Sequence, residues 1–281
     1  MRVLVTGAGG QLGHDVVAAC GGAGDEVVAA DRARLDVTDR DEVLGAITTL
    51  RPDAVIHCAA WTAVDACESD PERAFAANAL AVRWVRDACD RTGAHLVHVS
   101  TDYVFDGTLD RPYHEWDAPN PTSVYGRSKL AGEAEAGPGA SIARTSWVCG
   151  LHGSNMVHTV ARLSAERDSL TFVDDQRGCP TFTADLAPAL RRLAVDRRSG
   201  VHHLTNGGAV SWFEFVREIV AGLGRDPDMV QPISTADLDP PRPAPRPFNS
   251  VLDNAVWRLA GLPALRHHTA PLTELLTELS A

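Results

Sequence analysis

A glycine-rich turn directly after the first apolar run restricts what this chain can fold into. Residues 6–13 read TGAGGQLG, and their glycines separate a short predicted strand from a predicted helix. That helix should run from about Gln11 to the stop signal at Gly21 and Gly22. Glycines placed in this way let the backbone turn tightly and approach a pyrophosphate, whose charge lies at the helix N-terminus. The turn therefore predicts a dinucleotide site.

The second predicted strand ends at a carboxylate where dinucleotide folds recognise a ribose. Asp31 follows the apolar run EVVAA, roughly 20 residues after the glycines. A carboxylate there can accept a hydrogen bond from the ribose 2′-hydroxyl and repels a 2′-phosphate, which favours NAD. Arg32 and Arg34 follow immediately and offer guanidinium groups to the same phosphate. The sequence leaves the choice between NADH and NADPH open.

Strand and helix patterns alternate through the first half of the chain. The expected elements are a helix over 39–50, a buried strand over 54–60, a helix from about Pro71 to Gly93 capped by Ser69 or Asp70, and a strand over 95–99. This spacing is typical of right-handed βαβ units, which form a parallel sheet covered on both faces. We predict an α/β fold, a Rossmann-type doubly wound parallel sheet with a smaller C-terminal α/β substrate-binding lobe.

The pattern changes beyond Val148, where the segments become shorter and carry glycine and proline breaks. We expect residues 1–148 to form the dinucleotide-binding domain, together with a segment at about 183–205 that returns to it. Residues from about 149–182 and 206–281 should form the substrate lobe.

Composition argues against several classes of partner. A formal charge of -11 and a pI near 5.4 do not fit a nucleic-acid-binding protein, which needs a concentrated basic face. No apolar run approaches the roughly 20 residues of a membrane span, and the first one is too short for a signal peptide. The six cysteines lack metal-ligand spacing, so we expect free, buried thiols, no metal site and a cytoplasmic protein. His267 and His268 are expected at the surface.

A candidate proton-transfer group follows the strand over 95–99. Tyr125 and Lys129 lie on one face if the segment from about Ser123 onward is helical. The ammonium would then favour ionisation of the phenol, whose ordinary pKa of about 10 makes it a slow acid at neutral pH. Thr101 would add a hydroxyl at the carboxyl end of the strand, where open α/β sheets place ligands. A Tyr and a Lys at this spacing also occur on solvated helix faces; the dinucleotide turn favours the functional interpretation.

Seven ordered blocks resemble one family. They are GAGGQLG at 7–13, AAWTAVD at 59–65, STDYVFDG at 100–107, YGRSK at 125–129, RTSWV at 144–148, DQRGCPT at 175–181 and RPFNS at 246–250. The first four are similar to the extended short-chain dehydrogenase/reductase superfamily. The third and the last three are similar, within it, to the dTDP-4-dehydrorhamnose reductase family, and together the blocks span nearly the whole chain.

This resemblance implies an NADPH- or NADH-dependent reductase of the C4 ketone of a dTDP-4-keto-6-deoxyhexose. The simplest reaction converts dTDP-4-dehydrorhamnose to dTDP-L-rhamnose. The implied catalytic residues are Thr101, Tyr125 and Lys129. Tyr125 would donate the proton, Lys129 would hold the nicotinamide ribose and lower the phenol pKa, and Thr101 would hydrogen-bond the ketone oxygen.

The resemblance also implies which residues contact the ligands. Cofactor contacts are expected at Gly7, Gly10, Gln11, Leu12, Gly13, Asp31, Arg32, Asp36, Val37, Ala59, Ala60, Trp61, Thr62, Tyr125 and Lys129. Substrate contacts are expected at Thr101, Asp102, Tyr103, Trp147 and Arg246. Arg242 and Arg246 would fork onto the diphosphate, although their proline-rich segment also fits a polyproline ligand. Asp102 is otherwise a turn-capping carboxylate, and Trp61 and Trp147 are otherwise packing residues.

Several alternatives stay open at this stage. The chemistry could act on another dTDP-deoxysugar of natural-product glycosylation, and the pocket residues would decide. A non-catalytic dinucleotide-binding regulatory subunit is disfavoured because Thr101, Tyr125 and Lys129 are all present. A dehydratase would need two adjacent carboxylates after the threonine, where this chain has Asp102 and Tyr103. We expect a monomer or a homodimer.

Overall fold

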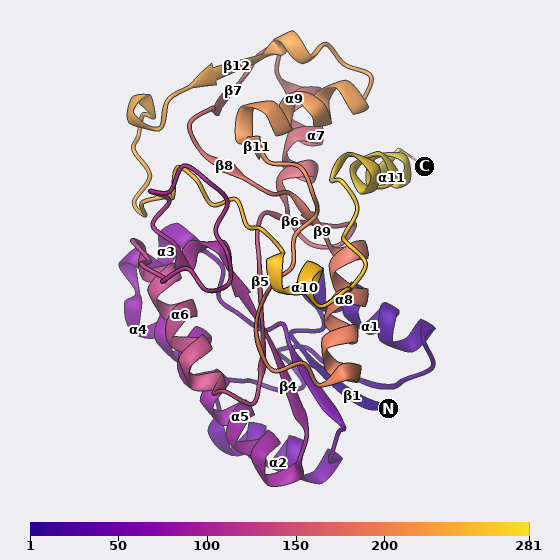
Figure 1. Ribbon diagram of the computed structural model, residues 1–281. Coiled ribbons are helices and arrows are strands. Elements are labelled where there is room, and N and C mark those ends of the chain that lie inside the picture. The colour runs from indigo at the N-terminus through magenta and orange to yellow at the C-terminus, as the bar shows by residue number, and fades with distance from the viewer. Residues whose placement is uncertain (281) are drawn as a thin grey trace.

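Six parallel strands form the main sheet of the protein. The computed structural model describes residues 1–280, and the strand order is β10-β5-β4-β3-β1-β2 (Figure 1). The strands are β1 (Arg2–Thr6), β2 (Glu26–Ala30), β3 (Ala54–His57), β4 (His95–Thr101), β5 (Ser141–Thr145) and β10 (Gly200–His203). All neighbouring pairs in this sheet are parallel. The predicted Rossmann-type sheet is confirmed.

Helices cover both faces of this sheet, as Figure 1 shows. The helices on one face are α2 (Arg40–Leu50), α5 (Ala81–Thr92) and α6 (Val124–Ala136), and those on the other are α1 (Gln11–Gly22) and α8 (Thr183–Asp196). Successive strand residues point to opposite faces. Leu4 accordingly packs in one core cluster with Val43 and Val85, whereas Val5 packs in another with Leu190. The sheet is thus buried between two hydrophobic layers.

The long helix that the sequence predicts from Pro71 to Gly93 contains an irregular turn. Asp70 caps its start by accepting the Arg73 N–H at 3.1 Å, and Gly93 ends it with φ +74°. Both ends are as expected. Between α4 (Pro71–Phe75) and α5 lies a π-helical turn, η1 (Ala76–Leu80), which the sequence did not predict. The short helix α3 (Val64–Ser69) precedes this array.

Short strand pairs and helices form the C-terminal lobe, beyond the carboxyl edge of the main sheet (Figure 1). The strand pairs are β6 (Val148–Cys149) with β9 (Thr181–Phe182), β7 (Leu170–Val173) with β12 (Val230–Ile233), and β8 (Arg177–Gly178) with β11 (Val210–Ser211). The helices are α7 (Met156–Glu166), α9 (Trp212–Gly222) and α11 (Thr269–Leu279), which share a third hydrophobic cluster. Short turns η2 (Asp102–Val104), η3 (Pro227–Met229) and η4 (Thr235–Asp237), and helix α10 (Ala255–Leu259), complete the fold.

The chain returns from this lobe to the main sheet through α8. Its buried residues Leu186 and Leu190 pack in the cluster that contains Val16 of α1. Strand β10 then pairs with β5 at the edge of the sheet. Residues 183–203 therefore pack with the N-terminal half of the chain.

The expected surface position of the histidine pair is wrong for one of its members. His268 is only 1% exposed, and its Nε2 atom lies 2.6 Å from a carboxylate oxygen of Glu218. It immediately precedes α11, whose packing against α9 turns the imidazole inward. His267 is exposed, as expected.

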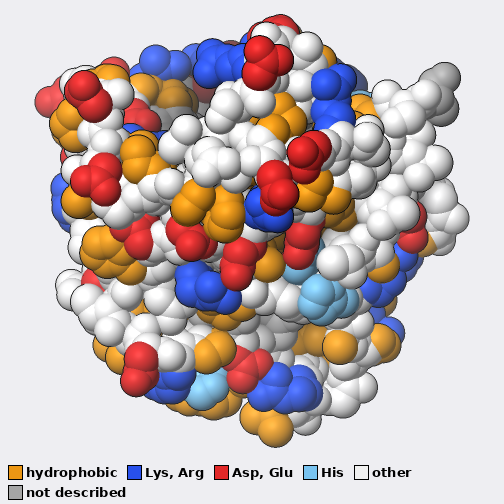
Figure 2. All heavy atoms as spheres, turned by 90° about the horizontal axis from the view of Figure 1, so that it is seen from above, with side chains coloured by type: hydrophobic (Ala, Val, Ile, Leu, Met, Phe, Trp, Pro, Cys, Tyr) orange, Lys and Arg blue, Asp and Glu red, His pale blue; other side chains and the backbone are white. Residues whose placement is uncertain are grey.

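All six cysteines are free thiols, and all but the half-buried Cys58 are buried, which confirms that prediction. Within residues 1–280, none of the helices has the length and apolar character needed to cross a bilayer. Figure 2 shows acidic and basic side chains interspersed over the face seen from above Figure 1.

Candidate active site

The glycine turn lies where the strand order of the sheet reverses. Strand β1 is flanked by β2 and β3, so a crevice opens at the carboxyl ends of β1 and β3. Gly7 has φ +67°, and a Cβ atom there would lie 2.7 Å from the backbone nitrogen of Ala59. Gly10 is the N-cap of α1 and provides no side-chain cap, so the first N–H groups of the helix remain available. This cradle fits a pyrophosphate group.

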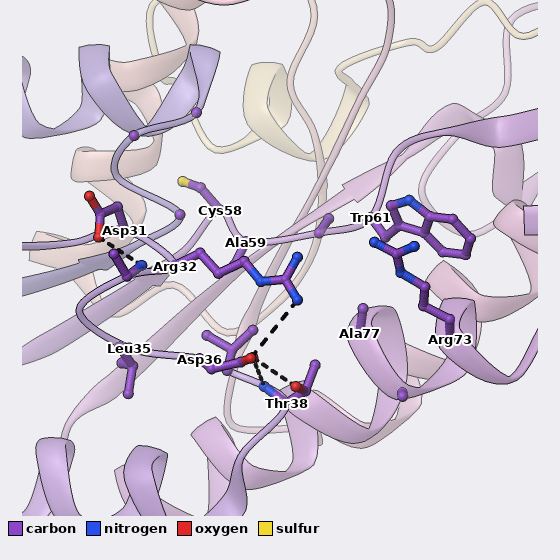
Figure 3. A pocket seen from close by; sticks show the side chains of 17 residues that line it. Asp31, Arg32, Leu35, Asp36, Thr38, Cys58, Ala59, Trp61, Arg73 and Ala77 are labelled. Carbon is purple, nitrogen blue, oxygen red and sulfur yellow. Dashed lines mark hydrogen bonds and ion pairs between the residues drawn. The ribbon is translucent and has the colours of Figure 1, made fainter. Parts of the chain in front are cut away.

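A cavity of about 670 Å³ extends from this turn past the ends of β2 and β3 (Figure 3). The predicted cofactor residues that line it are Gly7, Gly10, Asp31, Arg32, Asp36, Val37, Ala59, Ala60 and Trp61. Those that do not line it are Gln11, Leu12, Gly13, Thr62, Tyr125 and Lys129. Its volume falls within the usual range for small-molecule sites.

Asp31, Arg32 and Asp36 line one end of the cavity, and Arg34 lies beside it. Asp31 accepts the N–H groups of Ala33 and Arg34, both at 3.0 Å. The Arg34 guanidinium donates to the Ala29 carbonyl at 3.0 Å, which holds it at the end of β2. The Arg32 side chain is 79% exposed and lies 4.0 Å from Asp36. Figure 3 shows it extending across the cavity, so Arg32 is the arginine better placed to meet a phosphate.

Two residues that sequence reasoning missed, Arg73 and Asn78, contact Trp61 at the opposite end. The Arg73 guanidinium lies 4.4 Å above the ring of Trp61, and both residues line the cavity (Figure 3). Asn78, in the π-turn, is fully buried. Its side chain accepts the Trp61 N–H at 2.8 Å and donates to the Trp61 carbonyl and to the Ser128 hydroxyl, each at 3.0 Å. The sequence feature that could have indicated Asn78 is its position as the single polar side chain in the apolar run AANAL.

Thr101, Tyr125 and Lys129 are brought together, buried, where β4 meets α6. Thr101 ends β4, and α6 begins after Ser123, which accepts the Gly126 N–H at 3.1 Å. The predicted helix start at Ser123 is therefore confirmed. The Thr101 side chain lies close enough to the Tyr125 phenol to act on its pKa.

Burial dominates the acid–base properties of this group. It raises the pKa of Tyr125 above its ordinary value, and the nearby Thr101 hydroxyl opposes this effect. Burial likewise lowers the pKa of Lys129 to about 8, against the opposing charge of Glu133. The expectation that Lys129 leaves the phenol with a lowered pKa is wrong for this structure. The ammonium donates instead to the Val99 carbonyl at 2.7 Å.

Asp102 presents a buried carboxylate beside this pair of hydroxyls. Its Oδ1 atom accepts the Thr101 hydroxyl at 3.0 Å, while Oδ2 finds no partner among residues 1–280. Burial raises the pKa of Asp102 to about 6. The Tyr103 ring meets the Tyr125 ring edge-on, with centroids 5.6 Å apart. An unpartnered acceptor at this depth is suited to a ligand hydroxyl.

The two remaining predicted substrate residues lie on the lobe side. Trp147 has φ +46° and stacks on Trp212 at a centroid distance of 3.5 Å. It is therefore a packing residue, whether or not it also contacts a substrate. Arg246 is paired with Asp65, to which its Nη2 atom donates at 2.6 Å. Its guanidinium thus joins the proline-rich segment to α3, and Arg242 is exposed.

A doubly wound parallel sheet, a glycine cradle at its switch point and a buried Thr–Tyr–Lys group beside the resulting cavity define a class of protein. These features are those of a dinucleotide-dependent oxidoreductase of the short-chain dehydrogenase/reductase type.

Comparisons with known proteins identify the family. The family described as "RmlD substrate binding domain" matches residues 1–281. The chain is 44% identical to a dTDP-4-dehydrorhamnose reductase of Streptomyces griseus, with 97% of this chain and 92% of the relative covered. It is 39% identical to a dTDP-4-keto-6-deoxy-D-glucose reductase of Streptomyces niveus, with 100% and 98% covered. The crystal structure of a dTDP-4-dehydrorhamnose reductase from Bacillus anthracis in complex with NADP has a TM-score of 0.94 and 36% identity, covering 99% of both chains. The chain belongs to the dTDP-4-dehydrorhamnose reductase family.

Proposed function

We propose that the protein uses NADPH or NADH to reduce the C4 ketone of a dTDP-4-keto-6-deoxyhexose. The simplest substrate is dTDP-4-dehydrorhamnose, which would give dTDP-L-rhamnose. The observation that carries this proposal is the grouping of Thr101, Tyr125 and Lys129, all buried where β4 meets α6 at the carboxyl edge of the sheet. The activities named for the two Streptomyces relatives support it.

Tyr125 is the proton donor in this proposal. Its raised pKa keeps the phenol protonated at neutral pH, which is the form that a donor requires. Hydride comes from the reduced nicotinamide when it is bound, and the ketone oxygen then becomes an alkoxide. Thr101 donates a hydrogen bond to that oxygen while Tyr125 transfers its proton to it, so the product leaves as a neutral alcohol.

Lys129 is the residue that would hold the nicotinamide ribose. An ammonium group has three N–H donors, and one of them is directed at the Val99 carbonyl. The others can serve ribose hydroxyls. At the opposite end of the dinucleotide, Asp31 and Arg32 would meet the adenosine ribose. Asp31 favours the free 2′-hydroxyl of NADH, and Arg32 favours the 2′-phosphate of NADPH. This combination suits a protein that accepts both dinucleotides.

The sugar would lie against the residues that follow β4. Asp102 offers the unpartnered Oδ2 atom to a sugar hydroxyl, and Tyr103 offers an aromatic edge next to Tyr125. On the lobe side, Trp147 would form a wall of the substrate pocket. Arg246 would release Asp65, with which it is now paired, and bind the diphosphate of the substrate instead. We propose that the dinucleotide domain and the nucleotide-sugar lobe lie on either side of the group formed by Thr101, Tyr125 and Lys129.

A second candidate substrate is the corresponding ketone that has not been epimerised, because the Streptomyces niveus relative is named for dTDP-4-keto-6-deoxy-D-glucose. The same catalytic group would serve both ketones. A purely regulatory role is disfavoured by the complete Thr101, Tyr125 and Lys129 set. We place the reaction in the cytoplasm, where the free thiols of this chain would stay reduced, and expect a monomer or a homodimer.

The test is oxidation of NADPH and NADH, followed by absorbance, with each of the two ketones supplied separately and the C4 configuration of the product determined. Rapid oxidation with the epimerised ketone to give dTDP-L-rhamnose is the expected result. Turnover of the other ketone alone would establish the second candidate. If neither ketone is reduced although the dinucleotide binds tightly, the proposal fails and a regulatory role becomes the better explanation.

A further inference from the structure

Two histidines and a carboxylate meet at a position outside the candidate active site. His14 and Asp15 lie near the N-terminus of α1, and His152 lies in the loop between β6 and α7. One ligand atom from each residue lies within 4.8 Å of the other two. The imidazole centroids of His14 and His152 are 3.5 Å apart, and His14 Nδ1 is 3.7 Å from Asp15 Oδ1. Segments far apart in the sequence therefore present three metal-ligating groups to one point.

Hydrogen bonds hold the two sides of this cluster in register. Gln11, in the first turn of α1, donates from Nε2 to the Val148 carbonyl at 2.8 Å. Its Oε1 atom accepts from Asn155 Nδ2 at 2.8 Å, and the same amide nitrogen lies 2.7 Å from the Gly150 carbonyl. The loop is thus fastened to α1 on both sides of His152, so the backbone that carries this imidazole is held without a ligand.

We propose that His14, Asp15 and His152 form a binding site for a divalent transition-metal ion of the Zn²⁺ type. Two imidazoles and a carboxylate are the protein ligands of one known type of four-coordinate zinc site, in which water takes the fourth position. Tetrahedral bonds of roughly 2 Å place ligand atoms about 3.3 Å from one another. To reach that value the two imidazoles, whose centroids are now 3.5 Å apart, must rotate so that one nitrogen of each ring points at the ion. Mg²⁺ prefers an all-oxygen shell and should not compete.

The surroundings favour a cation. Asp15 also lines a neighbouring cavity together with Glu274 and Glu278, and the whole chain has a formal charge of -11. A bound ion would join α1 to the loop that leads into the C-terminal lobe. Because Gln11 and the glycine turn belong to the start of α1, the ion would stiffen the cradle of the dinucleotide site. This inference does not depend on the identity of the sugar substrate.

The experiment is a titration of the metal-stripped full-length protein with ZnCl₂ in the presence of a chromophoric chelator. We expect one Zn²⁺ per chain in this site. His14→Ala and His152→Ala should each weaken binding by at least about tenfold, which corresponds to the loss of one ligand bond. Asp15→Asn should weaken it less. Unfolding midpoints without metal show whether each variant is folded; the two imidazoles form no buried hydrogen bond, so we expect little change.

His267→Ala is the matched control, because His267 is an exposed imidazole that does not belong to this cluster. This variant should bind Zn²⁺ as the unmodified protein does. Substitution with Co²⁺ gives an independent readout, since a tetrahedral site produces intense visible absorption that both His variants should lose. Absence of Zn²⁺ binding overturns the proposal. Binding that survives both His substitutions also overturns it, because the ion would then be held elsewhere, for example by thiols. Displacement by an equal concentration of Mg²⁺ contradicts the assigned ion type.

Discussion

Backbone geometry positions the proposed dinucleotide side of the candidate active site, whereas side-chain pairs between distant segments position its proposed substrate side. On the first side, Gly7 lets the turn after β1 pack against the backbone that follows β3. On the second side, Arg246 is fastened to Asp65. Asp175 accepts both the N–H and the hydroxyl of Thr235, at 2.7 and 2.6 Å.

The difference shows how the two sides should respond to change. A cradle made of backbone atoms has no side chain that can be truncated, so only added bulk can damage it. A surface held by polar pairs can be loosened one pair at a time, while the sheet beneath it stays folded. The predictions below separate the two sides by measuring dinucleotide affinity and sugar turnover independently.

The largest effect is expected at Tyr125, where the two sides meet. Tyr125→Phe removes the proton donor and should lower kcat by about 10²- to 10⁴-fold, while dinucleotide affinity changes by no more than a few-fold. Steady-state turnover and dinucleotide titration measure the two quantities. Tyr113→Phe is the control, because Tyr113 is a buried tyrosine that donates to Asp106 outside the site. Unchanged turnover in Tyr125→Phe would remove Tyr125 from the mechanism.

The next effect concerns the backbone cradle. Gly7→Ala forces a Cβ atom against the backbone of Ala59 at positive φ, and should cost about 2–3 kcal/mol of unfolding free energy together with most of the dinucleotide affinity. Gly45→Ala, on the exposed face of α2 with open space around the new Cβ, should instead stabilise by about 0.5–1 kcal/mol. Denaturant unfolding measures the stability of both variants, and titration measures their affinity for the dinucleotide. Equal behaviour of the two variants would mean that the cradle tolerates bulk.

Loss of the Arg246–Asp65 pair should affect the proposed substrate side alone. Arg246→Ala removes a largely buried guanidinium and should raise KM for the sugar substrate, with a stability loss of about 1–2 kcal/mol because Asp65 is partly exposed. The double variant with Asp65→Ala should be less destabilised than the sum of the two single variants. Dinucleotide affinity should not change. A parallel loss of dinucleotide affinity would show that the two sides are coupled through α3.

Asp102 makes stability depend on pH. Its folded-state pKa of about 6 lies above the ordinary value of 3.8, so between these values the folded chain binds a proton more tightly than the unfolded chain does. Stability should therefore fall as pH rises through this window. Relative to Asp102→Asn, the unmodified protein should lose on the order of 1–2 kcal/mol between pH 5 and pH 8. Denaturant unfolding at both pH values measures this difference, and a constant difference would mean that the carboxylate is stabilised in its charged form.

The smallest effect should be a change in cofactor preference. Asp31→Ala removes the group that repels a 2′-phosphate and should shift the NADPH/NADH ratio of kcat/KM several-fold toward NADPH, while Arg32→Ala should shift it the opposite way. Arg34→Ala is a useful comparison, because the Arg34 guanidinium already donates to Ala29. An unchanged ratio in Asp31→Ala would mean that this carboxylate serves only the turn that it caps.

Local sequence patterns predicted much of the N-terminal half of the chain, which contains the proposed dinucleotide side. The helices that begin at Gln11 and after Asp39, the cap at Asp70 and the stop at Gly93 are as the sequence indicated, because each depends on residues a few positions apart. The start of α6 at Ser123 was predicted on the same basis. The resemblance to a family supplied the role of each block, which spacing alone did not.

Features that depend on distant partners were not foreseen. The burial of His268 depends on Glu218, and the engagement of Arg246 depends on Asp65. His14 and His152 meet only because the loop after β6 crosses α1. The pKa of the Tyr125 phenol was misjudged because desolvation, which no sequence pattern reveals, raises it.

The π-helical turn at Ala76–Leu80 has a consequence for how this chain could change in evolution. A π-turn accommodates one residue more than an α-helical turn, so deleting one residue here would leave a continuous α-helix in which α4 and α5 keep their relative orientation. A deletion at the start of α5 would instead rotate everything beyond it by about 100° and turn its apolar stripe, which includes Val82 and Val85, away from the sheet. Loss of Asn78 itself would remove the clamp on Trp61. One-residue deletions should therefore be tolerated at the other positions of the π-turn and be rare within α5.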